Sequence, residues 1–131
     1  MIVKVIDSSS LIKYVAREED WEEVEEHIRE GCVTVDLAVK ETANALVKKM
    51  LKNEVDPETA KEILDHIPRI VKVKPQQEHL SKALEIAAKH GLPIYDTIFI
   101  ALSGSMDASL LTSDERQAEI SRECGVKAIL L

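Results

Sequence analysis

Apolar residues follow two different spacings along this chain, and the two spacings alternate. Short runs rich in β-branched and aliphatic residues are typical of buried strands, and five of them occur, at residues 2–7, 32–37, 70–73, 109–113 and 126–131. Between these runs the apolar residues recur every three or four positions, which is the period of one helix face. This spacing predicts helices over residues 10–16, 19–30, 37–53, 56–67, 76–90, 95–105 and 114–123.

The alternation of strands and helices predicts the fold class. Strands joined by helices form parallel sheets that are covered on both faces. We therefore expect an α/β fold, a three-layer α/β/α sandwich with a mostly parallel five-stranded sheet. The length of 131 residues is that of one domain, residues 1–131. Because open parallel sheets bind ligands outside the carboxyl ends of their strands, the residues that follow strands are the first candidates for a functional site.

Four carboxylates are expected at that edge of the sheet. Asp7 ends the first predicted strand, and Asp114 follows the fourth. Glu41 lies in the first turns of the helix after the second strand, and Asp96 opens the helix that leads into the fourth. A helix that precedes a parallel strand must begin at the carboxyl edge and run back. All four side chains can therefore converge.

Each of these acids also has a simpler interpretation. Asp7, Asp96 and Asp114 each stand where a helix N-cap accepts a free backbone N–H. Asp114 with Gln117 three residues later has the pattern of a capping box. Glu41 by itself is typical of a solvated helix surface. The residues taken singly leave both interpretations open.

The surroundings of the acids favour a shared site. Asp96 lies on one helical face with Phe99 and Ser103, so we expect it to point toward packed interior. Asn44 follows Glu41 by about one helical turn and is placed to donate a hydrogen bond to it. Neither acid has a lysine or arginine at a spacing that clearly pairs with it. Converging carboxylates repel one another, and a divalent cation relieves that repulsion. Oxygen ligands without cysteine or histidine suit Mg²⁺ or Mn²⁺.

Net charge limits the ways in which the chain can hold nucleic acid. The formal charge is −7, which argues against binding by charge alone, because phosphate contacts need lysine or arginine. Acidic residues concentrate in 18–30, a solvated helix face on which Trp21 is available to a partner. The candidate cations for holding a phosphate backbone are Lys13, Lys40, Lys48, Lys49 and Arg116.

The spacing of the cysteines and histidines fits neither a metal site built from these residues nor a disulfide framework. Cys32 and Cys124 form neither a CxxC pair nor a disulfide framework, so we expect reduced thiols in the cytoplasm. The histidines lack metal-ligand spacing and are expected at the surface or in packing; they are His27, His66, His79 and His90. No apolar run approaches about 18 residues, so no membrane span is expected, and the first residues lack the pattern of a signal peptide.

Four short motifs, in order, connect the chain to a known family. They are Asp-x-Ser, Glu-x-x-Asn, Tyr-Asp and Thr-x-Asp, within VIDSSSLI (5–12), KETANAL (40–46), IYDTIFIALS (94–103) and LLTSDER (110–116). In these stretches, which span most of its length, the chain resembles PIN domains, and among them the VapC-like toxin ribonucleases. Each motif is common by itself, and the specificity lies in their order and separation within a five-strand alternating chain.

The resemblance implies a PIN-like fold and a set of site residues. The implied catalytic and metal-binding residues are Asp7, Glu41, Asp96 and Asp114. The implied supporting residues are Ser9, Asn44 and Thr112. Some members carry a further acid just after the last aspartate. Here Glu115, Arg116 and Gln117 follow, with no aspartate among them, so the number of ions, one or two, stays open. Asp36 can lie at the rim but is better explained as a helix N-cap, and Asp107 belongs to the opposite edge.

The resemblance also implies an activity and partners. It implies a cytoplasmic endoribonuclease that hydrolyses RNA phosphodiester bonds with Mg²⁺ or Mn²⁺, as the toxin of a type II toxin–antitoxin pair. It implies a homodimer with a protein antitoxin, for which the apolar faces in 10–16 and 37–51 are plausible contacts. Two alternatives remain: a PIN nuclease in RNA processing outside such a pair, and a non-catalytic module. An aspartyl-phosphate enzyme is disfavoured, because Ser9 stands where a phosphatase motif needs a second acid.

Overall fold

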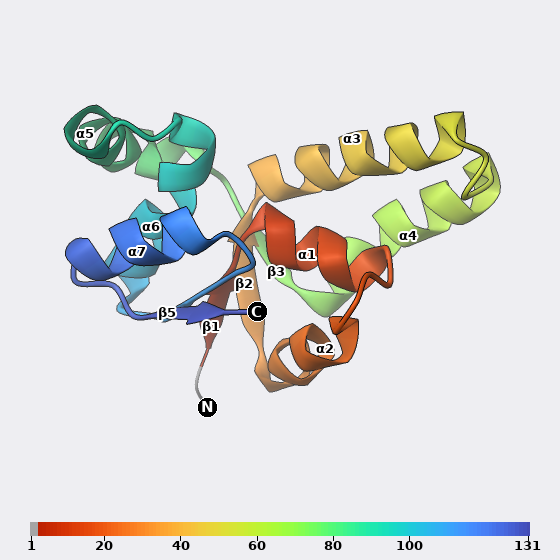
Figure 1. Ribbon diagram of the computed structural model, residues 1–131, viewed down its shortest axis with the longest axis horizontal. Coiled ribbons are helices and arrows are strands. Elements are labelled where there is room, and N and C mark those ends of the chain that lie inside the picture. Colours follow the sequence, from red (N-terminus) through yellow and green to blue (C-terminus); the bar gives the residue numbers. More distant parts are fainter. Residues whose placement is uncertain (1–2) are drawn as a thin grey trace.

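The computed structural model describes residues 3–131 as five strands and eight helical segments (Figure 1). The strands are β1 (Lys4–Ile6), β2 (Cys32–Val35), β3 (Lys72–Lys74), β4 (Leu110–Thr112) and β5 (Ala128–Leu130). The helices are α1 (Ser8–Val15), α2 (Trp21–Glu30), α3 (Asp36–Leu51), α4 (Pro57–Ile70), the short 3-10 helix η1 (Gln77–His79), α5 (Leu80–His90), α6 (Ile94–Met106) and α7 (Glu115–Glu123).

The sheet confirms the predicted fold class. Its strand order is β3-β2-β1-β4-β5, and every pair is parallel. The central strand β1 pairs Val5 with Val33 of β2 and with Leu110 of β4. The carboxyl ends of β1 and β2 lead directly into α1 and α3 (Figure 1). The residues that follow these strands therefore begin at the same edge of the sheet.

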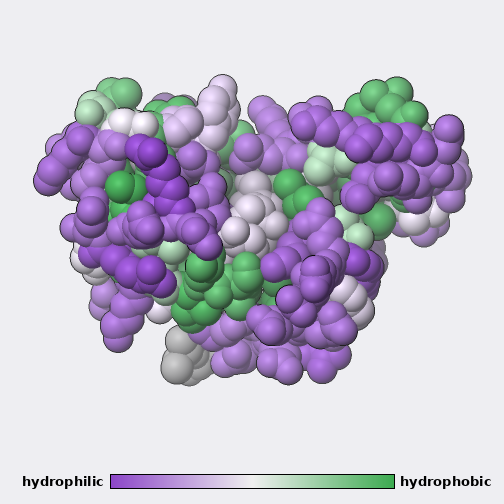
Figure 2. Space-filling view, in the orientation of Figure 1, coloured by the Kyte–Doolittle hydropathy of each residue, from purple (hydrophilic) through white to green (hydrophobic). Residues whose placement is uncertain are grey.

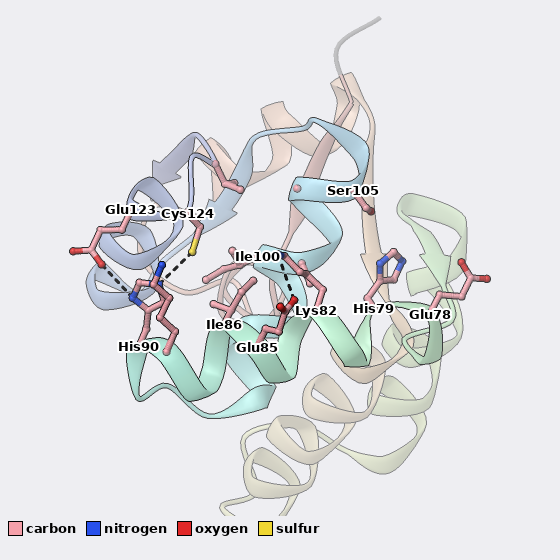
Figure 3. A pocket seen from close by; sticks show the side chains of 14 residues that line it. Glu78, His79, Lys82, Glu85, Ile86, His90, Ile100, Ser105, Glu123 and Cys124 are labelled. Atoms are coloured by element: carbon pink, nitrogen blue, oxygen red, sulfur yellow. Dashed lines mark hydrogen bonds and ion pairs between the residues drawn. The ribbon is translucent and has the colours of Figure 1, made fainter.

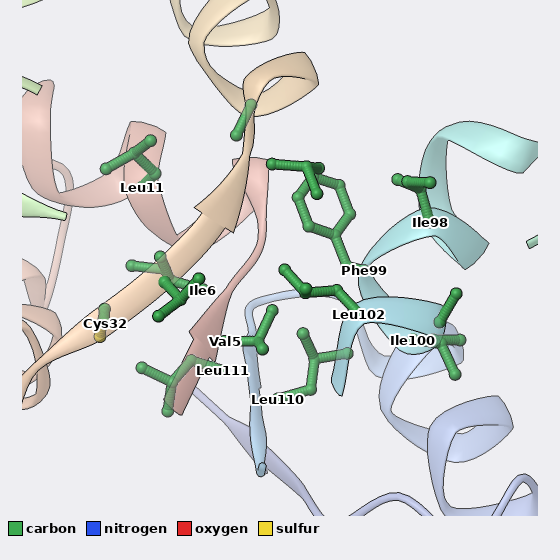
Figure 4. Packing of buried hydrophobic residues seen from close by; sticks show 14 of the residues in the cluster. Val5, Ile6, Leu11, Cys32, Ile98, Phe99, Ile100, Leu102, Leu110 and Leu111 are labelled. Carbon is green, nitrogen blue, oxygen red and sulfur yellow. The ribbon is translucent and has the colours of Figure 1, made fainter. Parts of the chain in front are cut away.

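Helix α6 forms much of the core against this sheet. Its residues 97–103 are all buried, so the helix has no wide polar face. Phe99 and Leu102 extend from α6 toward strand β1, which carries Val5 and Ile6 (Figure 4). A helix that is apolar nearly all round must be enclosed on several sides. This packing fixes the position of the α6 N-terminus, where Asp96 lies.

Two boundaries differ from the prediction for physical reasons. Helix α4 continues through Pro68 to Ile70, so the strand expected at 70–73 begins only at Lys72. Proline costs the helix one hydrogen bond, but Ile67 is fully buried and the N–H of Val71 still reaches its carbonyl oxygen at 3.1 Å. The first strand was expected over 2–7, and Ile2 lies outside the described residues. The other expected elements are present with shifted ends.

Asp36 corrects a smaller prediction. It is the first residue of α3 rather than its N-cap, a position held by Val35. Its Oδ1 accepts the N–H of Gln76 at 3.1 Å, which ties the start of α3 to the segment before η1. Asp107, in contrast, follows α6 and precedes β4, as the sequence indicates for the opposite edge. Within residues 3–131, no helix combines the length and apolar character needed to cross a membrane.

Candidate active site

Asp7 is the most enclosed carboxylate at the carboxyl edge of the sheet. It is 2% exposed and caps α1 by accepting the N–H of Ser10 at 3.0 Å. The hydroxyl of Ser9 donates to the same Oδ1 at 2.7 Å, and that of Thr112 donates to Oδ2 at 2.6 Å. Burial raises the pKa of Asp7 from 3.8 to about 6, against the three hydrogen bonds, which lower it. Asp7 is thus fixed in place but poorly solvated.

Thr112 joins Asp7 to Asp114. While its hydroxyl donates to Asp7, the same oxygen accepts the backbone N–H of Asp114 at 3.1 Å. Asp114 in turn caps α7 by accepting the N–H of Gln117 at 3.0 Å. Ser113 donates its N–H to Ser9 Oγ at 3.0 Å. The ends of β1 and β4 are therefore bound together by side chains as well as by the sheet.

Asp96 is not a helix cap. Pro93 occupies the N-cap position of α6, and Asp96 is the third residue of the helix. Its side chain is half-buried rather than enclosed in the core. Burial raises the pKa of Asp96, and the negative charges of Asp114 and Glu41 raise it further. The capping interpretation is wrong for this residue. The charges of the four acids affect one another in pairs, Asp7 with Asp114 and Asp96 with both Asp114 and Glu41.

Gln117 connects the two helices that carry Asp96 and Asp114. Only half of the expected capping box forms, because the Gln117 side chain does not return to Asp114. Its Nε2 instead donates to the backbone oxygen of Asp96 at 2.9 Å, and the residue is 3% exposed. Sequence reasoning missed this contact, since the same spacing from Asp114 fits a local cap. The amide sets the distance between the N-termini of α6 and α7.

Glu41 is held by a different partner from the one predicted. Its Oε1 accepts the hydroxyl of Ser8 at 2.5 Å. Asn44 is exposed, and no hydrogen bond joins it to Glu41 in the described part of the chain. Ser8 directly follows Asp7, so the start of α1 positions both acids. The predicted hydrogen bond from Asn44 does not form, and the packing of α1 against α3 supplies Ser8 as the donor.

The four acids form a loose group whose donor chemistry fits a hard cation. None of the ion pairs among residues 3–131 includes any of them. Carboxylate and hydroxyl oxygens are the donors that Mg²⁺ and Mn²⁺ prefer. In the described residues, however, no three acidic, histidine or cysteine side chains lie close enough to hold an ion together. The donor types fit, and the spacing is wider than a closed coordination shell.

A separate cavity lies away from the four acids. It has a volume of about 840 Å³ and is lined by α5, α6 and the end of α7 (Figure 3). His90 contacts Glu123 there at 3.3 Å and the Cys124 thiol at 3.7 Å. None of the four acids lines this cavity. Both cysteines are free, as predicted.

Replacing Thr112 with valine is expected to weaken this centre. Valine keeps the shape but removes the hydroxyl that lowers the pKa of Asp7, so that pKa should rise further. The backbone N–H of Asp114 also loses its acceptor. We expect a loss of about 1–3 kcal/mol in the free energy of unfolding near neutral pH, measured by urea denaturation. Thr112→Ser retains the hydroxyl and serves as the control; equal losses in both variants would contradict the role of the hydrogen bonds.

The parallel sheet, its order and the carboxylates at its edge define a PIN domain. The family model for the PIN domain matches residues 4–123, and the chain belongs to this family. Ribonuclease VapC3 of Pyrobaculum aerophilum is 31% identical over 120 residues, which cover 88% of this chain and 92% of that protein.

Solved structures share the fold. PAE2754 from Pyrobaculum aerophilum superposes with a TM-score of 0.70 at 23% identity, covering 97% of this chain and 89% of that one. VapBC2 from Rickettsia felis, solved with a DNA fragment from its promoter, superposes with a TM-score of 0.71 at 12% identity, covering 99% of both chains. At these identities the likeness concerns the fold.

Proposed function

We propose that this protein is a divalent-metal-dependent endoribonuclease whose site consists of Asp7, Glu41, Asp96 and Asp114. The observation that carries the proposal is the coupling of the four acids: burial and then the charges of Asp114 and Glu41 raise the pKa of Asp96, and burial and the charge of Asp114 raise that of Asp7. Such a concentration of unpaired carboxylates costs stability and is typical of a functional site. The relationship to Ribonuclease VapC3 supports RNA as the substrate.

The residues of this chain have distinct roles in the proposed site. When bound, Mg²⁺ or Mn²⁺ would offset the negative charge of the phosphodiester and would lower the pKa of a water molecule. Asp7, Asp96 and Asp114 are the proposed ligands, and Glu41 either joins them or orients the attacking water. Ser9 and Thr112 hold Asp7 in one orientation through their hydroxyls. Asp96 and Glu41 are only half-buried, so both carboxylates are accessible to an ion.

We further propose that the protein is the cytoplasmic toxin of a toxin–antitoxin pair and forms a homodimer. The outer end of α3 offers a contact surface: Leu51 is 79% exposed and Val47 is 43% exposed. Apolar residues are visible at the outer end of the α3–α4 hairpin, surrounded there by polar ones (Figure 2). Exposed apolar side chains of this kind favour protein contacts. A protein antitoxin is the expected partner, because the VapC-like resemblance implies one.

Removal of the metal tests the activity. Purified protein incubated with a mixed RNA pool is expected to cut it in Mg²⁺ or Mn²⁺ and to lose this cleavage in EDTA, with recovery when excess Mn²⁺ is added. Fragment lengths on a denaturing gel provide the measurement, and a DNA pool of the same length distribution provides the comparison. Persistent cleavage in EDTA would contradict a metal-dependent mechanism. Intact RNA under all conditions would favour a non-catalytic PIN module.

A further inference from the structure

One face of α3 carries a regular row of polar side chains beside the candidate active site. Lys40, Asn44 and Lys48 follow one another at intervals of four residues and are all exposed. They line a cavity of about 330 Å³ together with Glu41, one of the four acids. Residues four apart on a helix lie one above the other. The row therefore extends along α3 and passes beside Glu41.

The charges of this row are not neutralised by the protein. Lys40 and Lys48 have no carboxylate partner within ion-pair distance among residues 3–131. Lys49, the next residue on the same helix, pairs with Glu54 at 3.4 Å. Lys40 and Lys48 are thus two exposed, unpaired cations two helical turns apart on the face of α3 that carries Glu41. Among the candidate cations, Lys49 is therefore set apart by its ion pair, and Lys40 and Lys48 by the cavity that they share with Glu41.

The spacing of the row fits a polymer of regularly placed anions. Four residues of α-helix rise about 6 Å, which is comparable to the separation of successive phosphates along an extended nucleic acid strand. Asn44, between the two lysines, offers an amide that donates hydrogen bonds without charge. Ile12 and Ala45 also line the cavity and give it an apolar part. Lysines in such a row bind phosphates as point charges, independently of the base sequence.

We propose that Lys40, Asn44 and Lys48 hold consecutive phosphates of the RNA strand and guide it to Glu41. The proposal rests on the endoribonuclease function proposed above and assigns its substrate-binding surface. It also addresses how an acidic protein holds an acidic polymer. The unpaired lysines supply the backbone contacts, while the carboxylates lie at the end of the row. Because these contacts recognise the backbone, they set affinity rather than sequence preference.

The salt dependence of RNA binding tests this proposal. A fluorescent single-stranded RNA is titrated with protein in EDTA, which prevents metal-dependent cleavage, and the binding constant is measured by anisotropy over a range of NaCl concentrations. Each lost phosphate contact on a single strand reduces the slope of log K against log salt by about 0.7. The double variant Lys40→Ala/Lys48→Ala is therefore expected to bind more weakly and to lose about 1.4 from the slope.

Lys49→Ala is the matched control, because Lys49 is adjacent on α3 and already paired with Glu54. Its slope should equal that of the wild type. Circular dichroism checks that the double variant is folded, which is expected because both side chains are exposed. An unchanged slope in the folded double variant, or an equal loss in Lys49→Ala, would overturn the proposal. If the wild type cuts RNA but the double variant keeps the wild-type salt slope, the proposed phosphate contacts are wrong and the nuclease function stands. If the wild type neither binds nor cuts RNA, both the contacts and the proposed function fail.

Discussion

Asp96→Asn is expected to reduce metal-dependent RNA cleavage by on the order of 10³-fold, equivalent to about 4 kcal/mol of transition-state stabilisation. Asparagine keeps the shape of the side chain and removes its negative charge. The charges of both Asp114 and Glu41 raise the pKa of Asp96, in addition to burial, so Asp96 interacts with two of the other three acids. The measurement is the initial rate of cleavage of one RNA at several Mn²⁺ concentrations, compared with the wild type.

Asp107→Asn provides the matched control for this experiment. Asp107 lies at the opposite end of α6 and is exposed. Its backbone has a φ of 51°, a left-handed conformation that asparagine adopts as readily as aspartate. We therefore expect a stability within about 0.5 kcal/mol of the wild type and an unchanged cleavage rate. Activity of Asp96→Asn equal to that of Asp107→Asn would show that the proposed site is misplaced.

Asp7→Asn is expected to abolish cleavage and yet to stabilise the protein near neutral pH. The pKa of Asp7 is about 6 in the folded protein against an ordinary value of 3.8. The folded state therefore binds the proton more tightly than the unfolded state, and this contribution to stability is fully present below about pH 4 and is lost as the pH rises through about 6. The difference in pKa corresponds to about 3 kcal/mol at most.

Asparagine at position 7 removes the free-energy cost of burying a charged carboxylate at neutral pH, but it accepts fewer hydrogen bonds than the carboxylate. The expected net gain in the free energy of unfolding is about 1–2 kcal/mol at about pH 7.5. At about pH 5 much of the Asp7 population is protonated in the folded protein, so the gain should shrink by about 1 kcal/mol. Urea denaturation of the wild type and of Asp7→Asn at the two pH values measures this gain in the free energy of unfolding. A gain that does not change with pH, or a loss at neutral pH, would contradict the account.

The candidate site shows how one residue can satisfy two interpretations. Asp7 and Asp114 are helix caps, as the local pattern indicates, and each accepts a first-turn N–H. Capping and site geometry are compatible here because both helices start at the carboxyl edge of the same sheet. Asp96 was equally eligible as a cap from its sequence. Only the helix that begins two residues earlier, at Ile94, excludes that role.

The sequence by itself determined what depends on neighbouring residues. The spacing of apolar residues along the chain defined the alternation of strands and helices. That alternation implied a parallel sheet with the four acids at one edge. The order of the short motifs around Asp7, Glu41, Asp96 and Asp114 pointed to the PIN family without any structure. These features are local, or follow from the order of elements along the chain. They can therefore be read before the chain is folded.

The tertiary structure alone decided the contacts between distant segments. Ser8 reaches Glu41 across 33 residues, and Gln117 reaches the backbone of Asp96 across 21. In both cases a nearer partner in sequence, Asn44 or Asp114, seemed sufficient. Packing also decided which lysines remain unpaired along α3. Such contacts depend on the relative placement of whole helices, which is fixed by burial of their apolar faces and not by the spacing of polar residues along the chain.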